Sequence, residues 1–394
     1  MINTLEFYSG IGGLHLSLKR ACIVANVVRA FDWDPAASEV YTANFGKGIA
    51  QRTDISQIQA ADIIPLHADL WLLSPACQPY TVLNPAAKGA ADPRARSFLH
   101  LVEEVIPALA KTGHHPKRLL VENVAGFESS TTRQTLVDTM KSVGYNVAEF
   151  LLTPLQFGIP NSRLRYYFLA KSGSLSFANL SQDSLSTSPI HRSIPGHGQD
   201  WVDPRFQTHS ESETAQEASL PLSSYLDNVS FEKYAIPDKI LRKKAILFDI
   251  VKPSAKRSCC FTRGYAHMIE GTTVLQMNEE LDTTETFNAY AAAVERQVAT
   301  TPESQDQFLY ILRPLQLRYF TPDELLRIFH FNPVGVPTYT SGMESEKVEA
   351  STSVFHWPQS TSIKTRYRLI GNSVNVKVVT ELIKYLFEGD ELET

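Results

Sequence analysis

The residue of this chain best suited to covalent chemistry is Cys77, in the run Leu-Leu-Ser-Pro-Ala-Cys-Gln-Pro-Tyr over residues 72–80. The run begins as an apolar, buried-strand pattern, and its two prolines favour a shaped loop, so we expect the thiol to face a cleft. The alternative is a cysteine packed as a small hydrophobic residue. A free cysteine has a pKa of about 8.5, so a reactive one needs a group that favours the thiolate. The candidates are backbone N–H groups around Gln78 and the side chains of Arg163 and Arg165.

A carboxylate that could assist this thiol is Glu122, in the apolar run Leu-Leu-Val-Glu-Asn-Val over residues 119–124. Burying a carboxylate at the end of such a strand is costly unless it has a partner. A carboxyl group in this position could protonate or hydrogen-bond a ring nitrogen of a nucleobase. The alternative is a structural carboxylate that anchors a loop through the N–H groups of Val124 or Ala125.

A glycine-rich segment stands where a predicted strand turns into a helix, at Tyr8, Ser9, Gly10, Ile11, Gly12 and Gly13. Glycine lets the backbone approach a ligand closely, and the start of a helix offers free N–H groups. The spacing is not the dinucleotide G-x-G-x-x-G pattern, so we do not assign NAD. A plain strand–helix turn is the alternative.

Three further side chains stand where later strands are predicted to end. Asp32 follows the strand over residues 27–31 and could accept hydrogen bonds from ribose hydroxyls. Trp33 could stack on an adenine, and Asp54 either binds the adenine amino group or is an ordinary surface aspartate. Open α/β sheets bind ligands at strand exits, so these positions together predict a nucleoside cofactor.

The elements that must position these residues alternate between strand and helix, which predicts an α/β fold with a mostly parallel sheet. Predicted strands cover residues 3–8, 27–31, 70–73, 119–124, 147–153 and 165–170. Predicted helices cover residues 14–22, 35–44, 97–110, 238–248, 322–329 and 375–387. Residues 172–224 are rich in Ser, Thr, Gln and Pro, which predicts a weakly ordered insertion. Residues 225–363 predict a smaller second lobe.

Bulk composition narrows the class of protein. The 394 residues, 43% of them hydrophobic, suffice for two lobes with separate cores. No apolar run reaches the roughly 20 residues of a membrane helix, and no signal peptide pattern opens the chain, so we expect an intracellular enzyme. Four cysteines are too few for a disulfide framework and lack zinc spacing. The net charge of -5 argues against indiscriminate nucleic-acid coating but allows local basic clusters, at residues 239–244 and 252–263.

Taken in order, these motifs resemble the cytosine-5 methyltransferase family over nearly the whole chain, most weakly within residues 172–224. The resemblance implies a Rossmann-like methyltransferase domain at residues 1–171 and 364–394, with helices on both faces of its sheet, and a target-recognition lobe at 225–363. It assigns catalytic roles to Cys77, Glu122, Arg163 and Arg165. It assigns S-adenosylmethionine contacts to the glycine-rich segment (residues 8–13) and to Asp32, Trp33, Asp54, Ile55, Ser74, Asn372, Ser373 and Val374.

The second lobe resembles the branch of this family that methylates RNA at position 38 in the anticodon loop of aspartate tRNA. Its Cys-Phe-Thr triplet at residues 260–262 is similar to one that marks this branch. The implied substrate contacts are Gln78, Asn123, Lys256, Arg257, Cys260, Phe261, Thr262 and Arg263. The chain departs from the branch at Ala76, normally proline, and at Tyr80, normally phenylalanine. Ala76 loosens the loop because a fixed φ is lost, and the Tyr80 hydroxyl needs a partner if buried.

The resemblance implies covalent catalysis on a flipped-out cytosine. The thiolate of Cys77 adds to C6, Glu122 binds N3 and the exocyclic amine, and C5 takes a methyl group from S-adenosylmethionine. The alternatives are a DNA cytosine-5 methyltransferase, a nucleic-acid-binding homologue with little turnover, or a small-molecule methyltransferase, which needs no thiol. We expect tRNA, or DNA, as partner, a cytoplasmic or nuclear location, and neither metal nor membrane. The oligomeric state is open, with a monomer favoured.

Overall fold

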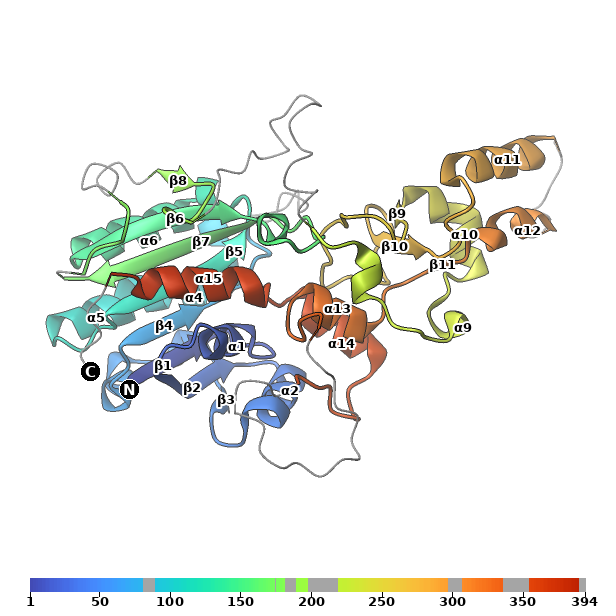
Figure 1. The fold of residues 1–394 in the computed structure, drawn as a ribbon. Coiled ribbons are helices and arrows are strands. Elements are labelled where there is room, and N and C mark those ends of the chain that lie inside the picture. The colour runs from blue at the N-terminus through green and yellow to red at the C-terminus, as the bar shows by residue number, and fades with distance from the viewer. Residues whose placement is uncertain are drawn as a thin grey trace.

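The computed structural model describes residues 1–80, 89–173, 175–180, 189–197, 219–296, 307–335 and 354–389. A large sheet with helices packed on it forms one end of the molecule, and a smaller lobe extends from it, with α11 and α12 at the far tip (Figure 1). None of the described helices is long and apolar enough to cross a membrane.

The large sheet is mixed and mostly parallel, as predicted. Its strands are β1 (Ile2–Phe7), β2 (Ala25–Asp32), β3 (Ala50–Arg52), β4 (Leu70–Leu73), β5 (Arg118–Val124), β6 (Tyr145–Leu152), β7 (Arg165–Ser172) and β8 (Ile190–His191). They lie in the order β3-β2-β1-β4-β5-β7-β6-β8. The pairs β5–β7 and β7–β6 are antiparallel, and the others are parallel. The carboxyl ends of β1, β2, β4 and β5 therefore meet at one edge.

Each face of the sheet packs against its own helices, because side chains alternate along a strand. In β4, Leu70 and Leu72 join a core with α1 (Gly13–Arg20) and α15 (Val376–Phe387). Trp71 and Leu73 join the opposite core, which contains α3 (Ala60–Ile63), α4 (Arg96–His100), α5 (Ile106–Lys111) and α6 (Thr131–Ser142). Helix α2 (Pro35–Phe45), which follows β2, is capped by the carboxylate of Asp34. The predicted two-sided architecture is confirmed.

The predicted helix over residues 97–110 forms, with an irregularity in its middle. A π-helical segment at Leu101–Val105 separates α4 from α5. Pro107 stands in the first turn of α5 and lacks the N–H that a continuous α-helix would use. The π-helical segment thus stands directly before the turn in which the proline lacks this hydrogen bond.

The second lobe contains a small sheet that the sequence did not predict, in the order β11-β10-β9. Its strands are only two to four residues long: β9 (Asp249–Val251), β10 (Thr273–Gln276) and β11 (Leu317–Arg318). Around them lie α9 (Phe231–Tyr234), α10 (Asp238–Lys244), α11 (Thr283–Glu295) and α12 (Leu309–Leu312). The helix predicted over residues 238–248 ends at Lys244 and continues as a 3-10 turn to Leu247.

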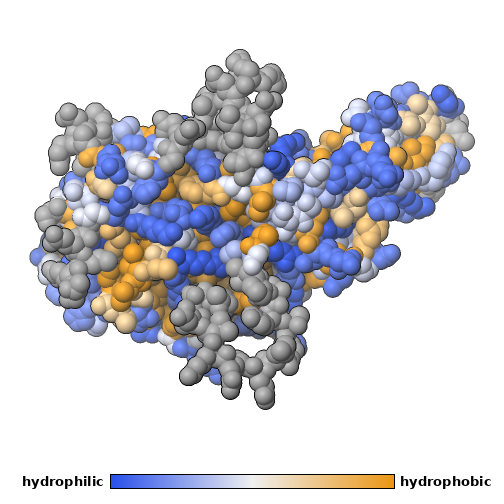
Figure 2. Space-filling view, in the orientation of Figure 1, coloured by the Kyte–Doolittle hydropathy of each residue, from blue (hydrophilic) through white to orange (hydrophobic). Residues whose placement is uncertain are grey.

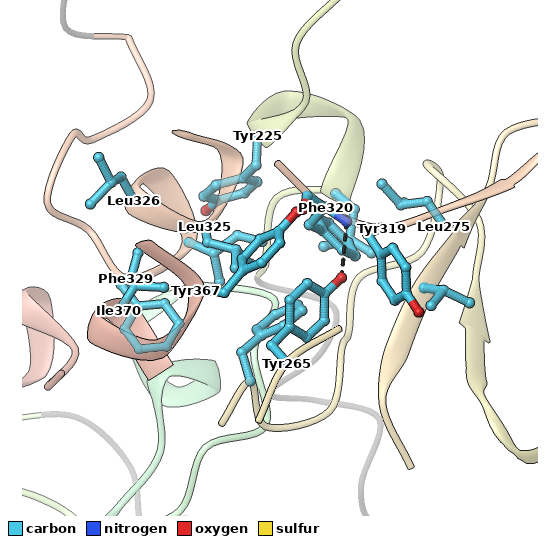
Figure 3. Packing of buried hydrophobic residues seen from close by; sticks show 14 of the residues in the cluster. Tyr225, Tyr265, Leu275, Tyr319, Phe320, Leu325, Leu326, Phe329, Tyr367 and Ile370 are labelled. Atoms are coloured by element: carbon cyan, nitrogen blue, oxygen red, sulfur yellow. Dashed lines mark hydrogen bonds between the residues drawn. The ribbon is translucent and has the colours of Figure 1, made fainter. Parts of the chain in front are cut away.

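An aromatic cluster joins the second lobe to the helices α13 (Pro322–Ile328) and α14 (Ile363–Gly371) (Figure 3). The ring of Tyr265 lies 5.0 Å from that of Tyr367. The Tyr265 hydroxyl accepts a hydrogen bond from the Phe320 N–H at 2.9 Å, and the Tyr367 hydroxyl donates to the Phe320 carbonyl at 2.6 Å. These buried hydrogen bonds and ring contacts fix the segment around Tyr265, which follows the Cys-Phe-Thr triplet, relative to α14.

The serine-rich segment at residues 172–224 is described only in part. Its residues 174, 181–188 and 198–218 lie outside the described part of the chain. Within the described part, Phe177 and Ile194 are buried against the sheet, and β8 pairs in parallel with β6. These pieces therefore belong to the large domain.

Candidate active site

The loop that carries Cys77 leaves β4 at the edge where the parallel strands end. Parallel pairing places Phe7 of β1 beside Leu73 of β4, and Leu73 beside Val121 of β5. The backbone N–H of Ser74 then donates to the Phe7 carbonyl at 3.3 Å. Cys77 is half-buried rather than sealed in a core. This placement favours a reactive Cys77 over a packed one.

Glu122 lies beside this loop and is held by two partners. Its carboxylate is buried, accepts a hydrogen bond from the Ser74 hydroxyl at 3.0 Å, and lies 3.6 Å from the guanidinium Nε of Arg165. The N–H of Val124 is bound instead by the Asn123 side chain, at 2.8 Å. The structure thus brings Glu122 to the nucleophile loop and does not show the alternative anchoring role through Val124.

Burial and charge act against each other at Cys77. Burial is the largest influence and raises the pKa of the thiol, and the nearby Glu122 raises it further. Arg165 and, more weakly, Arg163 lower the pKa of Cys77 without offsetting the rise. The resting thiol is therefore protonated near neutral pH, and Arg165 is the group positioned to stabilise its thiolate.

The buried guanidinium of Arg163 connects three distant segments of the chain. It is 3% exposed and donates to the Phe261 carbonyl at 2.8 Å and to the Ser373 carbonyl at 2.7 Å. A further N–H points to the sulfur of Cys260 at 3.3 Å. Because the side chain is buried and its two terminal nitrogens bind protein atoms, Arg163 is suited to holding these segments together.

Cys260, from the Cys-Phe-Thr triplet, lies between the two arginines. Both Arg163 and Arg165 direct N–H groups to its sulfur at 3.3 Å. Burial alone would raise the pKa of this thiol, but the two guanidiniums outweigh burial and lower it. The two guanidiniums therefore favour the thiolate form of Cys260, whose negative charge would offset the cost of burying two like charges.

The glycine-rich segment and Asp32 form one backbone cradle at the ends of β1 and β2. The Gly10 N–H donates to the Asp32 carboxylate at 2.7 Å. Gly10 and Gly12 have φ angles of 53° and 84°, which favour glycine, and a side chain at Gly10 would meet open space. Trp33 is 80% exposed beside this turn. An open cradle with an exposed indole fits a nucleoside-containing cofactor such as S-adenosylmethionine.

The carboxyl-terminal segment returns to this cradle. A Cβ atom on Gly13 would lie 2.8 Å from Val374 and 3.0 Å from the Ser373 hydroxyl, so Gly13 is needed for the close approach. Asn372 is the residue that caps the end of α14. Across the cradle, Asp54 is exposed and caps the turn at Ile55–Gln57, in which Ile55 is buried. All the predicted cofactor residues therefore lie at or next to one edge of the sheet.

A buried triad behind the cradle was missed by the sequence analysis. The carboxyl of Glu6 is fully buried and accepts from the Tyr41 hydroxyl at 2.9 Å and from the backbone N–H of His15 at 3.3 Å. Burial raises the pKa of Glu6 to about 8. The sequence signal that could have revealed this triad is Glu6 itself, an ionisable residue at an inward position of an apolar strand.

The residues predicted to contact substrate divide into two groups. Lys256, Arg257 and Arg263 are exposed on the loop that carries the triplet, and Arg257 pairs with Asp249 at 3.2 Å. Phe261 is buried, packing on Tyr265 and Phe320, so its side chain offers no surface to a ligand. Thr262, Gln78 and Cys260 are half-buried, and Asn123 is buried with its amide donating to the Pro75 carbonyl at 3.3 Å.

Comparison with known proteins agrees with this geometry. The model of the family described as C-5 cytosine-specific DNA methylase matches residues 2–388. The chain belongs to this family. The C-5 cytosine methylases found include a Homo sapiens tRNA (cytosine(38)-C(5))-methyltransferase, 35% identical over 98% of this chain and 99% of the relative. A Schizosaccharomyces pombe protein of the same name is 34% identical over 98% and 97%.

Solved structures of the family share the fold. The S. pombe Dnmt2 methyltransferase is 33% identical, covers 98% of each chain, and superposes with a TM-score of 0.70. A Spodoptera frugiperda DNMT2 mutant gives 0.73 at 33% identity, covering 98% of this chain and all of that one. The protein is thus a cytosine-5 methyltransferase with the fold of S-adenosylmethionine-dependent enzymes, and the predicted family and fold are confirmed.

Proposed function

We propose that this enzyme methylates C5 of cytosine in tRNA, at position 38 of the anticodon loop of aspartate tRNA, through a covalent adduct with Cys77. The observation that carries the proposal is one cluster at the sheet edge. In it, the Cys77 loop is hydrogen-bonded to Glu122, Arg165 lies beside the carboxylate, and the cofactor cradle adjoins. The relatives named for tRNA cytosine-38 methylation span nearly the whole chain, including the recognition lobe.

The chain's residues suit each proposed step. The thiolate of Cys77 adds to C6 of the cytosine, while Glu122 binds N3 and the exocyclic amine. The addition places electron density on C5, where S-adenosylmethionine, when bound, supplies an electrophilic methyl group. Loss of the C5 proton to solvent then re-forms the double bond and expels Cys77. Arg165 is close enough to both groups to stabilise the thiolate and to orient the carboxylate.

An anticodon loop suits a compact enzyme with a half-buried nucleophile. The target base must leave its stack before the thiol can reach C6. In a single-stranded loop this costs less than in a duplex, because no base pair is broken. We assign the phosphate contacts around such a base to the exposed arginines on the triplet loop, Arg257 and Arg263.

The test is transfer of tritiated methyl groups to purified tRNA and to DNA, with wild-type and Cys77→Ala proteins side by side. We expect incorporation into tRNA at position 38, and none with Cys77→Ala. The exposed Cys22 lies away from the cluster, so Cys22→Ala is the matched control and should keep full activity. Normal turnover by Cys77→Ala would overturn the mechanism.

A DNA substrate is the second candidate, because a Dictyostelium discoideum relative named DNA (cytosine-5)-methyltransferase is 33% identical over 99% of this chain. Preferential incorporation into DNA in the same experiment would favour it. A binding protein with little turnover is distinguished by RNA containing 5-fluorocytidine. That RNA should trap the covalent Cys77 adduct in an active enzyme only.

A further inference from the structure

The loop that carries Cys77 is anchored to the large domain on both sides of the cysteine. On the amino-terminal side, the Ser74 hydroxyl binds Glu122 at 3.0 Å, and the Pro75 carbonyl accepts from the Asn123 amide at 3.3 Å. On the carboxyl-terminal side, the Pro79 carbonyl accepts from the Gly89 N–H at 3.2 Å, and Tyr80 adds side-chain contacts. The two sides therefore reach different elements: the end of β5, and the segment beyond it that leads into α6.

Tyr80 makes a specific buried contact. Its side chain is 7% exposed, and its hydroxyl donates to the hydroxyl of Thr132 at 3.0 Å. Its ring meets that of Phe127 edge-on, with the centroids 4.7 Å apart. Thr132 is fully buried in the first turn of α6, whose backbone is fixed by the Ser130 cap. The Tyr80 hydroxyl, which was predicted to need a partner if buried, therefore binds Thr132 on a helix with a fixed first turn.

The anchor is coupled to the cysteine through a tight turn. The backbone N–H of Tyr80 donates to the Cys77 carbonyl at 3.0 Å, so a movement of Tyr80 moves the nucleophile. Between the two anchors stands Ala76, where no ring fixes φ. The family branch that this chain resembles has proline and phenylalanine at these two positions, a pair that restrains the backbone at residue 76 but offers no hydroxyl at residue 80.

We propose that the Tyr80–Thr132 hydrogen bond positions the Cys77 thiol for attack, and that it replaces the restraint that a proline at residue 76 would supply. Tyr80 is thus a positioning residue, acting through the loop rather than touching the substrate. The inference rests on the proposed function for its role in catalysis. The contact itself stands on the described geometry.

The test measures the rate at which Cys77 forms an adduct with 5-fluorocytidine RNA, alongside kcat, KM and cofactor affinity. Tyr80→Phe and Thr132→Val should each slow the adduct by about fivefold, the equivalent of one ordinary hydrogen bond. The double variant should be no slower than either single one, because both remove the same bond. Adding Ala76→Pro to Tyr80→Phe should restore the rate. KM for RNA and cofactor affinity should not move.

Tyr145 supplies the matched control, because its buried hydroxyl also makes one hydrogen bond, to the Pro116 carbonyl near the start of β5. Tyr145→Phe should lower the unfolding temperature without changing the adduct rate. If Tyr80→Phe behaved like Tyr145→Phe, or if Ala76→Pro gave no rescue, the positioning role would be overturned.

A second measurement separates this inference from the proposed function. Alkylation of Cys77 by iodoacetamide, followed by mass spectrometry of its peptide, needs no nucleic acid. Loosening the loop should expose the half-buried thiol further, so Tyr80→Phe should react faster and Ala76→Pro should reverse the gain. If wild-type protein formed no adduct with RNA or DNA, the proposed function would fail. The alkylation rates would then show by themselves whether the Tyr80–Thr132 hydrogen bond restrains the Cys77 loop. Equal rates in all variants would overturn it.

Discussion

At Cys77 the structure sets burial against charge, and the balance explains how one site can hold both a nucleophile and a carboxylate. Burial and Glu122 keep the thiol protonated at rest, while Arg165 favours the thiolate. Arg165 also lies 3.6 Å from Glu122, so each charge that could disturb the thiol is partly neutralised by the other. A substrate that engages Glu122 would shift this balance toward the thiolate.

This balance predicts that Glu122→Gln has opposite effects on two measurable rates. Removing the negative charge lowers the pKa of Cys77, so alkylation of Cys77 at pH 7–8 should become several-fold faster. Methyl transfer should fall by about a hundredfold or more, in the range for loss of a general acid. The exposed Glu104 gives a control of the same chemical change, because Glu104→Gln should alter neither rate. Slower alkylation in Glu122→Gln would contradict the proposed charge coupling.

Glu6 makes a separate prediction, on stability. Its pKa is raised by burial from 4.5 to about 8, so the folded protein keeps a proton that the unfolded chain releases. The contribution of Glu6 to stability is therefore fully present below about pH 4.5 and is lost as pH rises toward 8, by at most about 1.4 kcal/mol per pH unit. Urea unfolding of Glu6→Gln from pH 5 to 8 should lack this part of the slope. An identical slope in wild type and variant would show that Glu6 is ionised in the folded state.

At the scale of elements, the best-predicted features were the buried strands and the residues that follow their carboxyl ends. The apolar runs ending at Phe7, Leu73 and Val124 are long enough to identify as buried strands, and parallel pairing then brings their ends together without further information. The candidate cofactor residues at the strand exits, and the pair Cys77 and Glu122, could therefore be placed at one edge of the sheet from the amino-acid sequence alone.

Elements that depend on tertiary contacts escaped prediction. The strands β9, β10 and β11 are too short to show a period, and they exist because they pair with each other. Helix α6 has polar residues at many positions, and its buried face is visible only once the sheet is in place. Arg163 was predicted to have a catalytic role, and nothing in the sequence shows that its partners are carbonyls nearly a hundred or more residues away.

Gly371, the last residue of α14, yields a prediction at this scale. A Cβ atom there would overlap the backbone of Thr262 and Arg263, which cannot move aside as a flexible side chain would. Gly371→Ala should push the triplet loop away from residues 372–374, the candidate cofactor contacts that follow α14. We expect the stability of the fold to fall by about 1–3 kcal/mol and cofactor binding to weaken. Gly264→Ala is the control, because its Cβ would meet only the flexible side chain of Met268. Unchanged cofactor affinity in Gly371→Ala would contradict coupling between the two segments.

At the scale of the whole molecule, the net charge is negative, but basic residues gather on the loop that carries the Cys-Phe-Thr triplet. The net charge is -5, yet the loop that leads from β9 to the triplet and on to Tyr265 carries Lys252, Lys256, Arg257 and Arg263. Hydrophilic residues cover most of the second lobe on the face seen in Figure 2, with hydrophobic ones scattered among them. A local basic surface on an acidic protein favours one orientation of a polyanion and repels others.

The last prediction follows from this charge distribution. Reversing the charge in Arg257→Glu and Arg263→Glu together should weaken tRNA binding and flatten its salt dependence. Each lost phosphate contact removes about 0.7–0.9 from the slope of log K against log salt. Lys111→Glu is the control, because Lys111 is also exposed but ends α5 at the edge opposite the strand exits. Fluorescence anisotropy over a salt series measures both quantities. If the double reversal left the slope unchanged while Lys111→Glu reduced it, the RNA would bind a different face from the one that presents Cys77.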